Sequence, residues 1–286
     1  MTMCSVHSLH AQPNPHSYPI PGFFPIAGAE RKMEAGIFPN AAPEILKKFM
    51  PEGGAPANTL SFCLAIPYTR EVVLFDTGLG DATWLKSFDA FPAGEAPNDK
   101  ITPDPVKLIL LTHLHGDHIG GLLKGDERRF PNAKVMCSKP EHDGTPPAQL
   151  AKIKAAYGDD FSTFDFDDVV FKSKFPAQVT IKALDASGHT PGHTVFLVEH
   201  LERPDGGKIK NLILGDLLHA VALQFPAPEV CARYDSDPVK AVAARKRILD
   251  IAAQEKIPVR GMHFPDPYVG TVEKNEQGGY AFKTSE

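Results

Sequence analysis

The chain has 286 residues, which is enough for one large domain or two small ones. Its 30 basic and 35 acidic residues give a formal net charge of −5, so the sequence lacks the electrostatic signature of a nucleic-acid-binding protein. No apolar stretch is long enough to cross a membrane, and the four cysteines form no CxxC pair, so we expect no transmembrane segment and free thiols.

The N-terminal part is expected to be an arm with a short helix, residues 1–57, packed on residues 58–286 within a single domain. Prolines before residue 40 exclude a long helix there. A short helix is predicted over residues 43–50, with Pro43 in its first turn. Three phenylalanines are expected to dock the arm onto the body or onto the second subunit of a homodimer: Phe23, Phe24 and Phe38.

The first residues carry little targeting information. Met1 to Ala11 lacks a basic region and a long apolar core, so it is a poor signal peptide and favours the cytoplasm. A longer natural N-terminus would instead indicate the periplasm or secretion. His7, His10 and His16 have no spacing typical of a metal site, so a surface arm is the better interpretation.

Two short apolar runs then predict neighbouring strands over residues 60–66 and 71–76. Asp76 closes the second strand. It is either a turn-forming residue or an acceptor that orients a metal-binding histidine, and the sequence leaves both interpretations open. Residues 80–104 are expected to be a loop, and they include the only tryptophan, Trp84.

A buried strand over residues 106–111 leads into the segment with the strongest chemical signal. Four ligand-type side chains follow within six residues: His113, His115, Asp117 and His118. His113 and His115 are two residues apart and can point the same way from extended backbone. Imidazole and carboxylate are preferred ligands of zinc and similar divalent ions. Because one ion needs only three such groups, the spacing suggests two adjacent metals.

The segment after this loop is less informative. A strand is predicted over residues 134–138, and Thr145-Pro146 is expected to begin a helix that ends at Gly158. Residues 159–176 carry five phenylalanines among aspartates. We expect most of them to pack on the core, with one or two of the rings at the site. The alternative is a lid that brings aromatic walls to a pocket.

Strands and ligand-type residues alternate in the last part of the chain. Strands are predicted over 179–184, 195–198, 211–214 and 258–262, and a long helix from Asp237 to about Gln254. Ligand-type side chains recur where strands end: His113 to His118, His189, Asp216 and His263. Because strand ends gather at one edge of a sheet, we expect these side chains to converge.

These motifs resemble the metallo-β-lactamase superfamily over roughly residues 58–270. The HxHxDH signature is matched by His113 to His118, a GHTPGH segment by Gly188 to His193, and two later elements by Gly215-Asp216 and His263. The Gly215 to His219 segment further resembles the branch that holds methyl parathion hydrolase and acyl-homoserine lactonases.

The resemblance implies an α/β fold, the αββα four-layer sandwich, with a dinuclear site. One metal would take His113, His115 and His189, the other Asp117, His118 and His263, and Asp216 would bridge the two. Zn²⁺ is the expected ion, with Mn²⁺, Fe²⁺ and Co²⁺ as alternatives. His193 is expected to be a nearby structural donor, and His219 to line the pocket or serve the structure.

The resemblance also implies a hydrolase of a small-molecule lactone, ester or phosphotriester. The two ions would lower the pKa of a bridging water, and Asp117 is expected as the catalytic residue that orients this nucleophile and accepts its proton. One alternative is a redox protein resembling the persulfide dioxygenases, with mononuclear iron. Another is a β-lactam hydrolase, which is disfavoured because Asp216 stands where typical members place a cysteine. Nucleic-acid cleavage is disfavoured by the acidic net charge.

Overall fold

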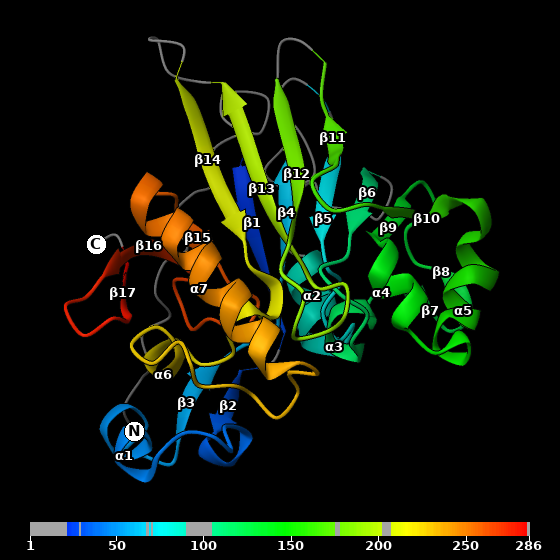
Figure 1. Cartoon of the computed structure of the whole chain (residues 1–286). Coiled ribbons are helices and arrows are strands. Elements are labelled where there is room, and N and C mark those ends of the chain that lie inside the picture. The colour runs from blue at the N-terminus through cyan, green and yellow to red at the C-terminus, as the bar shows by residue number, and fades with distance from the viewer. Residues whose placement is uncertain are drawn as a thin grey trace, which may run out of the picture.

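Two mixed β-sheets lie face to face and carry most of the chain (Figure 1). The computed structural model describes residues 22–28, 30–66, 69, 71–89, 105–174, 178–201 and 207–284. The expectations for His7, His10 and His16, for Cys4 and for the targeting signal lie outside these residues. Cys63, Cys137 and Cys231 are buried free thiols, as expected.

The first sheet runs in the order β1-β4-β5-β6-β9-β10, with antiparallel pairing from β1 to β5 and parallel pairing from β5 to β10. Its strands are β1 (Gly22–Ala27), β4 (Leu60–Ala65), β5 (Val72–Phe75), β6 (Val106–Leu110), β9 (Lys134–Ser138) and β10 (Phe161–Phe164). β5 is buried at every position, because one face packs on the second sheet and the other on helices.

The second sheet runs in chain order from β11 to β17, and only β14 and β15 pair in parallel. Its strands are β11 (Val169–Lys172), β12 (Val179–Asp185), β13 (Thr194–Leu201), β14 (Lys208–Ile213), β15 (Val259–Arg260), β16 (Val269–Lys274) and β17 (Tyr280–Lys283). β12 alternates between buried and half-buried residues, as its sequence predicts for a strand with one face in the core.

Aromatic rings from both sheets fill the space between them. The ring centroids of Phe75 and Phe196 lie 5.6 Å apart, and those of Phe164 and Phe196 lie 5.9 Å apart. Such tilted and edge-to-face arrangements are favourable beyond the area that they bury. The two sheets are therefore joined by a dry apolar core that continues from β4 to β14.

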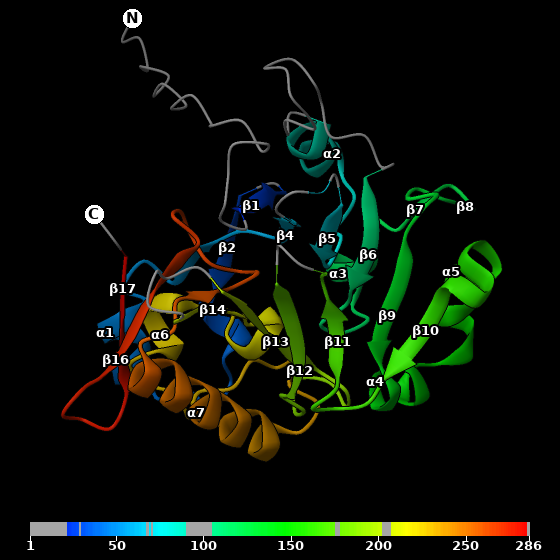
Figure 2. The same ribbon diagram turned by 90° about the horizontal axis from the view of Figure 1, so that it is seen from above.

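Helices cover the outer face of each sheet and complete four layers in the order αββα (Figure 2). They are α1 (Pro43–Phe49), α2 (Ala82–Asp89), α3 (Gly116–Ile119), α4 (Lys139–Gly144), α5 (Pro147–Tyr157), α6 (Val221–Gln224) and α7 (Pro238–Glu255). α5 buries Leu150, Ile153 and Tyr157 on the first sheet, the stripe expected from its sequence. α7 begins where Asp237 accepts a hydrogen bond from the Lys240 amide.

The N-terminal segment packs on the body beside the second sheet. β2 (Arg31–Glu34) pairs with β3 (Gly54–Ala57), and both lie with α1 against α6. Phe38 is buried in this contact. β1 adds an edge strand to the first sheet, with Phe24 packed on its helical side. β1 pairs with β4 along its whole length, from Gly22 opposite Ala65 to Ala27 opposite Leu60, so this part of the arm docks on the body as an edge strand.

Three local expectations about loops, strands and helix caps differ from the structure. α2 begins inside residues 80–104, because Asp81 caps it and Trp84 buries its ring in the core. The strand over 258–262 is shorter than predicted and is not the last one, since β16 and β17 follow it. Thr145 does not cap α5; its hydroxyl donates to the Glu141 carbonyl at the end of α4.

Candidate metal centre

The expected ligand residues come together around one carboxylate, that of Asp216. It follows β14 in a 3₁₀ turn, and it is 3% exposed. Its Oδ2 lies 3.8 Å from His113 Nε2 and 3.3 Å from His189 Nε2. Its Oδ1 lies 3.1 Å from both His118 Nε2 and His263 Nε2. The two oxygens therefore face two separate groups of imidazoles.

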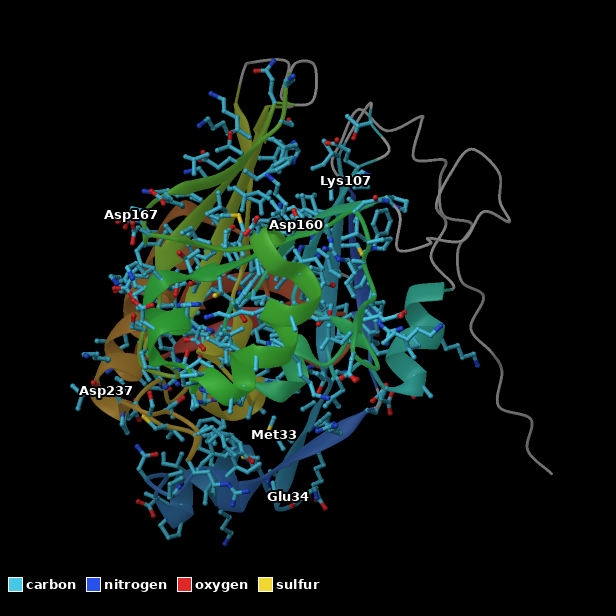
Figure 3. All side chains as sticks on the ribbon, turned by 90° about the vertical axis from the view of Figure 1, so that its right-hand side faces the viewer. Met33, Glu34, Lys107, Asp160, Asp167 and Asp237 are labelled. Carbon is cyan, nitrogen blue, oxygen red and sulfur yellow. The ribbon has the colours of Figure 1, made fainter. Side chains whose placement is uncertain are left out.

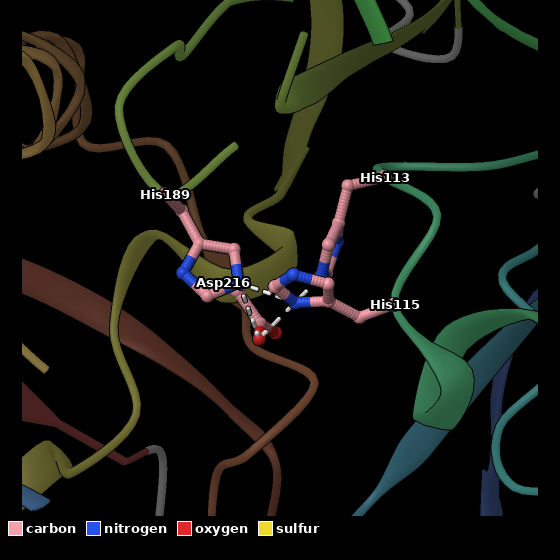
Figure 4. Close-up of side chains that lie close together, drawn as sticks. All are labelled: His113, His115, His189 and Asp216. Atoms are coloured by element: carbon pink, nitrogen blue, oxygen red, sulfur yellow. Dashed lines mark hydrogen bonds and ion pairs between the residues drawn. The ribbon is translucent and has the colours of Figure 1, made fainter. Parts of the chain in front are cut away.

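Two clusters of ligand atoms contain the residues expected for the two metals. His113, His115, His189 and Asp216 offer ligand atoms within 4.8 Å of one another, as do Asp117, His118 and His263. His219 offers further ligand atoms, because it forms similar groups with His189 and Asp235 and with Asp216 and His263. Figure 4 shows the rings of the first cluster turned toward the carboxylate of Asp216. The structure thus brings all seven predicted ligand residues into one site.

Strand ends explain this convergence. His113 to His118 follow β6, Asp216 follows β14, and His263 follows β15. His189 lies in the turn between β12 and β13, and the Thr194 amide at the end of this turn donates to the Thr112 carbonyl of the first sheet. This bond fixes the turn of one sheet against the ligand loop of the other.

Hydrogen bonds behind the site set which nitrogen of each ring faces inward. Three Nδ1 atoms lie within hydrogen-bond distance of outer oxygens: His118 of Asp76 at 2.7 Å, His263 of the Asn58 carbonyl at 2.8 Å and His189 of Asp235 at 3.0 Å. The Thr112 hydroxyl donates its proton to Asp76, so it accepts one from His113 Nδ1 at 3.1 Å. In the neutral form of each ring, Nε2 keeps a lone pair that points at the cluster.

The donor set fits a cation. His113 Nε2, His118 Nε2 and Asp216 Oδ1 are buried and have no hydrogen-bond partner among the residues that the structure describes. His118 Nε2 and Asp216 Oδ1 nevertheless lie 3.1 Å apart. Two acceptors this close in a buried site repel each other unless a proton or a cation lies between them.

The charges of the site favour a proton on His118 and a carboxylate at Asp216. Burial opposes a positive charge on His118, but Asp216 and Asp76 flank the ring and hold its pKa well above the usual value. Burial likewise opposes the negative charge of Asp216, yet the surrounding His118, His263 and His219 keep its pKa well below normal. A metal ion at His118 Nε2 would therefore compete with a proton for the same lone pair.

Asp76 is both a turn-forming residue and an acceptor that orients a histidine, the two interpretations that the sequence leaves open. Its φ of 54° turns the chain sharply after β5, and its buried carboxylate accepts from Thr112 and His118. Burial raises the pKa of Asp76 against the lowering effect of these partners. The residue orients His118 and joins β5 to the ligand loop after β6.

Two residues near the site match their expected secondary roles. His193 accepts from the Asp216 amide at 2.9 Å and its Nδ1 lies 3.1 Å from the Ala186 carbonyl, so both nitrogens are used by the backbone. A side chain at Gly215 would place its Cβ 2.6 Å from His193 Nε2, which explains the glycine at φ 56°. His219 lines the site: it is 2% exposed, and its Nε2 lies 3.2 Å from Asp216 Oδ2.

Sequence patterns missed the residues that hold the ligand loops from behind. Glu141 in α4 accepts from the Leu114 amide, the Thr190 hydroxyl and the Gly192 amide, so one buried carboxylate joins the two histidine loops. Asp235 orients His189 in the same way. Asp235 lies in the Asp235-Ser236-Asp237 segment before α7, which resembles the same branch of the superfamily, although its role could not be predicted from that segment. No short motif marks Glu141, since its partners lie 27 to 51 positions away along the chain.

The ligands open into a cavity of about 530 Å³. Its wall contains Met33, Ile37, Leu79 and Tyr234, and Arg31 and Lys32 lie in the same wall. The N-terminal segment thus lines the pocket, as the arm was expected to, but with β2 and the turn after it rather than with phenylalanines.

The favoured packing of residues 159–176 on the core is confirmed for three of the rings, and the alternative of a lid is wrong for them. β10 and β11 are edge strands of the two sheets, and Phe164 lies in the core between them at 4% exposure. Phe161 and Phe171 pack against the same two core clusters, because their strands pair with β9 and β12. Figure 3 shows Asp160 and Asp167 well apart from Met33 of the cavity wall.

Comparisons with known proteins agree with this fold. The model of the metallo-beta-lactamase superfamily matches residues 58–202, just over half of the chain. A solved structure of the hydrolase AbOPH, described as a member of the beta-lactamase superfamily, superposes with a TM-score of 0.75 at 25% identity, over 92% of this chain and 94% of that one. AidC, a dizinc quorum-quenching lactonase solved with a product, superposes with a TM-score of 0.75 at 22% identity over the same shares.

A curated relative adds a match in sequence alone. The hydroxyacylglutathione hydrolase of Prochlorococcus marinus (strain NATL1A) is 34% identical over 113 residues, which are 40% of this chain and 37% of the relative. The matched part therefore spans little more than a third of that relative's length. None of the helices described in the structure is long and apolar enough to cross a membrane. By its family match the chain belongs to the metallo-β-lactamase superfamily, and its histidine–aspartate cluster could hold divalent metal ions.

Proposed function

We propose that this chain is a metal-dependent hydrolase that opens lactones or cleaves related carboxylic and phosphoric esters at a dinuclear site, with Zn²⁺ as the resident ion. The observation that carries the proposal is the position of Asp216, whose two oxygens face two separate groups of imidazoles at the base of an apolar-walled cavity. AbOPH and the dizinc lactonase AidC share the fold across nearly the whole chain, which supports this choice of substrate class.

The proposed ligands divide as the two clusters do. His113, His115 and His189 would hold one ion, and Asp117, His118 and His263 the other, with Asp216 between them. Bound divalent ions supply Lewis acidity and lower the pKa of a water held in the site. The hydrogen bonds from Nδ1 atoms to Asp76, Asp235 and the Asn58 carbonyl keep the lone pairs aimed at this position.

Asp117 is the proposed catalytic residue. Its side chain is 29% exposed and lines the cavity, whereas Asp216 is almost fully buried. Its carboxylate oxygens lie 3.9 Å from His118 Nε2 and 3.8 Å from His263 Nε2. A carboxylate in this place can orient a nucleophilic water and accept its proton.

The cavity wall sets the proposed substrate shape. Met33, Ile37 and Leu79 offer apolar contacts close to the ligand residues, which suits an acyl chain attached to a lactone or ester. Burial of each methylene of such a chain contributes about 0.8 kcal/mol. Longer acyl chains should therefore bind more tightly until they outgrow the cavity.

Thioester hydrolysis is the second candidate, and only the 34% match to a hydroxyacylglutathione hydrolase favours it. The match covers 113 residues, 37% of that relative, so it supports this candidate less than the structural likeness supports the first.

A substrate panel on metal-loaded protein tests the proposal. It would contain an acyl-homoserine lactone, an aryl ester, a phosphotriester, an S-acyl glutathione and a β-lactam, each with and without a chelator. We expect chelator-sensitive hydrolysis with the highest kcat/KM on the lactone or on one of the two other esters. Highest activity on the β-lactam, or mononuclear iron with oxygen-dependent sulfur chemistry, would overturn it. Asp126→Asn serves as a control, because it removes an exposed carboxylate paired with Lys152 and should leave the activities of the panel unchanged.

A further inference from the structure

A buried arginine lies behind the site and is not among the expected ligands or their partners. Arg245, in the middle of α7, has no exposed surface. Its Nε donates to the Leu217 carbonyl at 2.7 Å, and its Nη1 to the carbonyls of Pro228 and Val230 at 2.8 Å each. Its Nη2 lies 3.4 Å from Asp235 Oδ2. A guanidinium buried this completely is costly unless its donors are used, and here four acceptors surround it.

Two of these acceptors lead directly to proposed metal ligands. Leu217 is the residue after Asp216, so the Nε bond fixes the chain immediately beside the shared carboxylate. Asp235 lies within hydrogen-bond distance of His189 Nδ1 through its other oxygen, at 3.0 Å. One guanidinium therefore contacts both the turn that carries Asp216 and the acceptor that orients His189.

The backbone reinforces the second connection. The Ser236 amide donates to the His189 carbonyl at 3.0 Å, and the Asp237 amide to the Gly188 carbonyl at 2.8 Å. Asp235 is thus held between the arginine and the histidine, with its Oδ2 facing Arg245 and its Oδ1 facing His189.

We propose that Arg245 is a positioning residue for the metal centre: it holds the Asp216 turn and the Asp235–His189 pair at the separation that the first metal requires. The inference rests on the proposed function, because it needs His189 and Asp216 to be ligands. An arginine that only stabilised the packing of α7 would leave metal affinity unchanged in any folded variant.

Metal affinity of the stripped, folded chain separates these roles. Arg245→Lys keeps the charge but not the planar fork that reaches four acceptors, and Asp235→Asn removes the charged acceptor while Arg245 keeps its three carbonyl bonds. The control is Arg247→Lys, an exposed arginine two residues further along α7 that contacts the Asp185 carbonyl. Each chain is titrated with Zn²⁺ against a chromophoric chelator, and its melting temperature is measured without metal.

We expect each of the first two variants to weaken binding of one metal equivalent by about tenfold or more, the usual effect of losing an outer partner of a ligand. The double variant should lose less than the sum of the two single effects, because both changes break the connection from Arg245 through Asp235 to His189. Arg247→Lys should bind as the unsubstituted chain does.

Folded variants with unchanged affinity and a lower melting temperature would show that Arg245 serves packing alone. If Arg245→Lys does not fold, Asp235→Asn decides, and unchanged affinity in that variant overturns the proposal. Absence of metal binding by the unsubstituted chain would instead refute the proposed metal site.

Discussion

Replacement of Asp76 by asparagine is expected to weaken metal binding although Asp76 is not itself a proposed ligand. Its Oδ2 faces the Thr112 hydroxyl and His118 Nδ1, each at 2.7 Å, and its Oδ1 accepts from the Thr112 amide. Asparagine can keep the bond to the amide. Its NH₂ group would then face two donors, so His118 would be driven toward the tautomer with its proton on Nε2.

The magnitude follows from these contacts. Loss of an outer partner of a metal ligand costs about 10–100-fold in affinity, or about 1.4–2.7 kcal/mol. Two buried hydrogen bonds to a charged acceptor are also lost, partly offset because a carboxylate is no longer buried. We expect a net cost of about 2 kcal/mol in the metal-free chain, which lowers the melting temperature by ~4–8 °C.

The assay compares Asp76→Asn with Asp126→Asn, which removes an exposed carboxylate paired with Lys152 at 2.8 Å. Zn²⁺ affinity is measured by chelator competition and stability by thermal unfolding of the stripped protein. Surface ion pairs contribute about 0–1 kcal/mol, so the control should change neither quantity much. Affinity within twofold of the unsubstituted chain for Asp76→Asn would refute the orienting role assigned to this carboxylate.

Three further outcomes are expected. By elemental analysis, His189→Ala should lose bound metal and His193→Ala should keep most of it; the reverse would show that the ligand in this loop is wrongly assigned. Phe164→Ala should lower the free energy of unfolding by about 3–5 kcal/mol and should lower kcat/KM equally for short and long acyl substrates. Met33→Ala should instead change the ranking of the short and long substrates. If Met33→Ala affected both substrates equally, Met33 would not be part of the pocket wall that contacts the substrate. Removal of metal should lower the melting temperature, and free Zn²⁺ at about 100 times its Kd should restore about 2.7 kcal/mol; a melting temperature insensitive to metal would contradict binding to the folded state.

Patterns within single segments of the sequence predicted those features of the structure that neighbouring residues decide. The four ligand-type residues from His113 to His118 follow one apolar strand, so their chemistry and their placement could both be predicted from a single segment. α7 was predicted from its cap at Asp237 and its buried stripe. In each case the residues that decide the structure are neighbours in sequence.

Contacts between distant segments could not be predicted in this way. The phenylalanines of residues 159–176 indicate burial, but only the pairing of β10 with β9 places Phe164 between the sheets rather than over the pocket. Arg245 resembles any basic residue of an amphipathic helix until the carbonyls of residues 217–230 surround it. The composition of a segment indicates that its side chains are buried, whereas tertiary packing decides against which face of a sheet they lie and which residues they contact.

The metal content of the purified chain tests the central proposal most directly. The protein is stripped with a chelator, reconstituted with excess Zn²⁺, freed of unbound metal and analysed for zinc per chain. Seven ligand groups, Asp216 and the six around it, exceed what one tetrahedral ion can use, so we expect about two ions per chain. A single tightly bound ion after reconstitution with excess metal would contradict the dinuclear site.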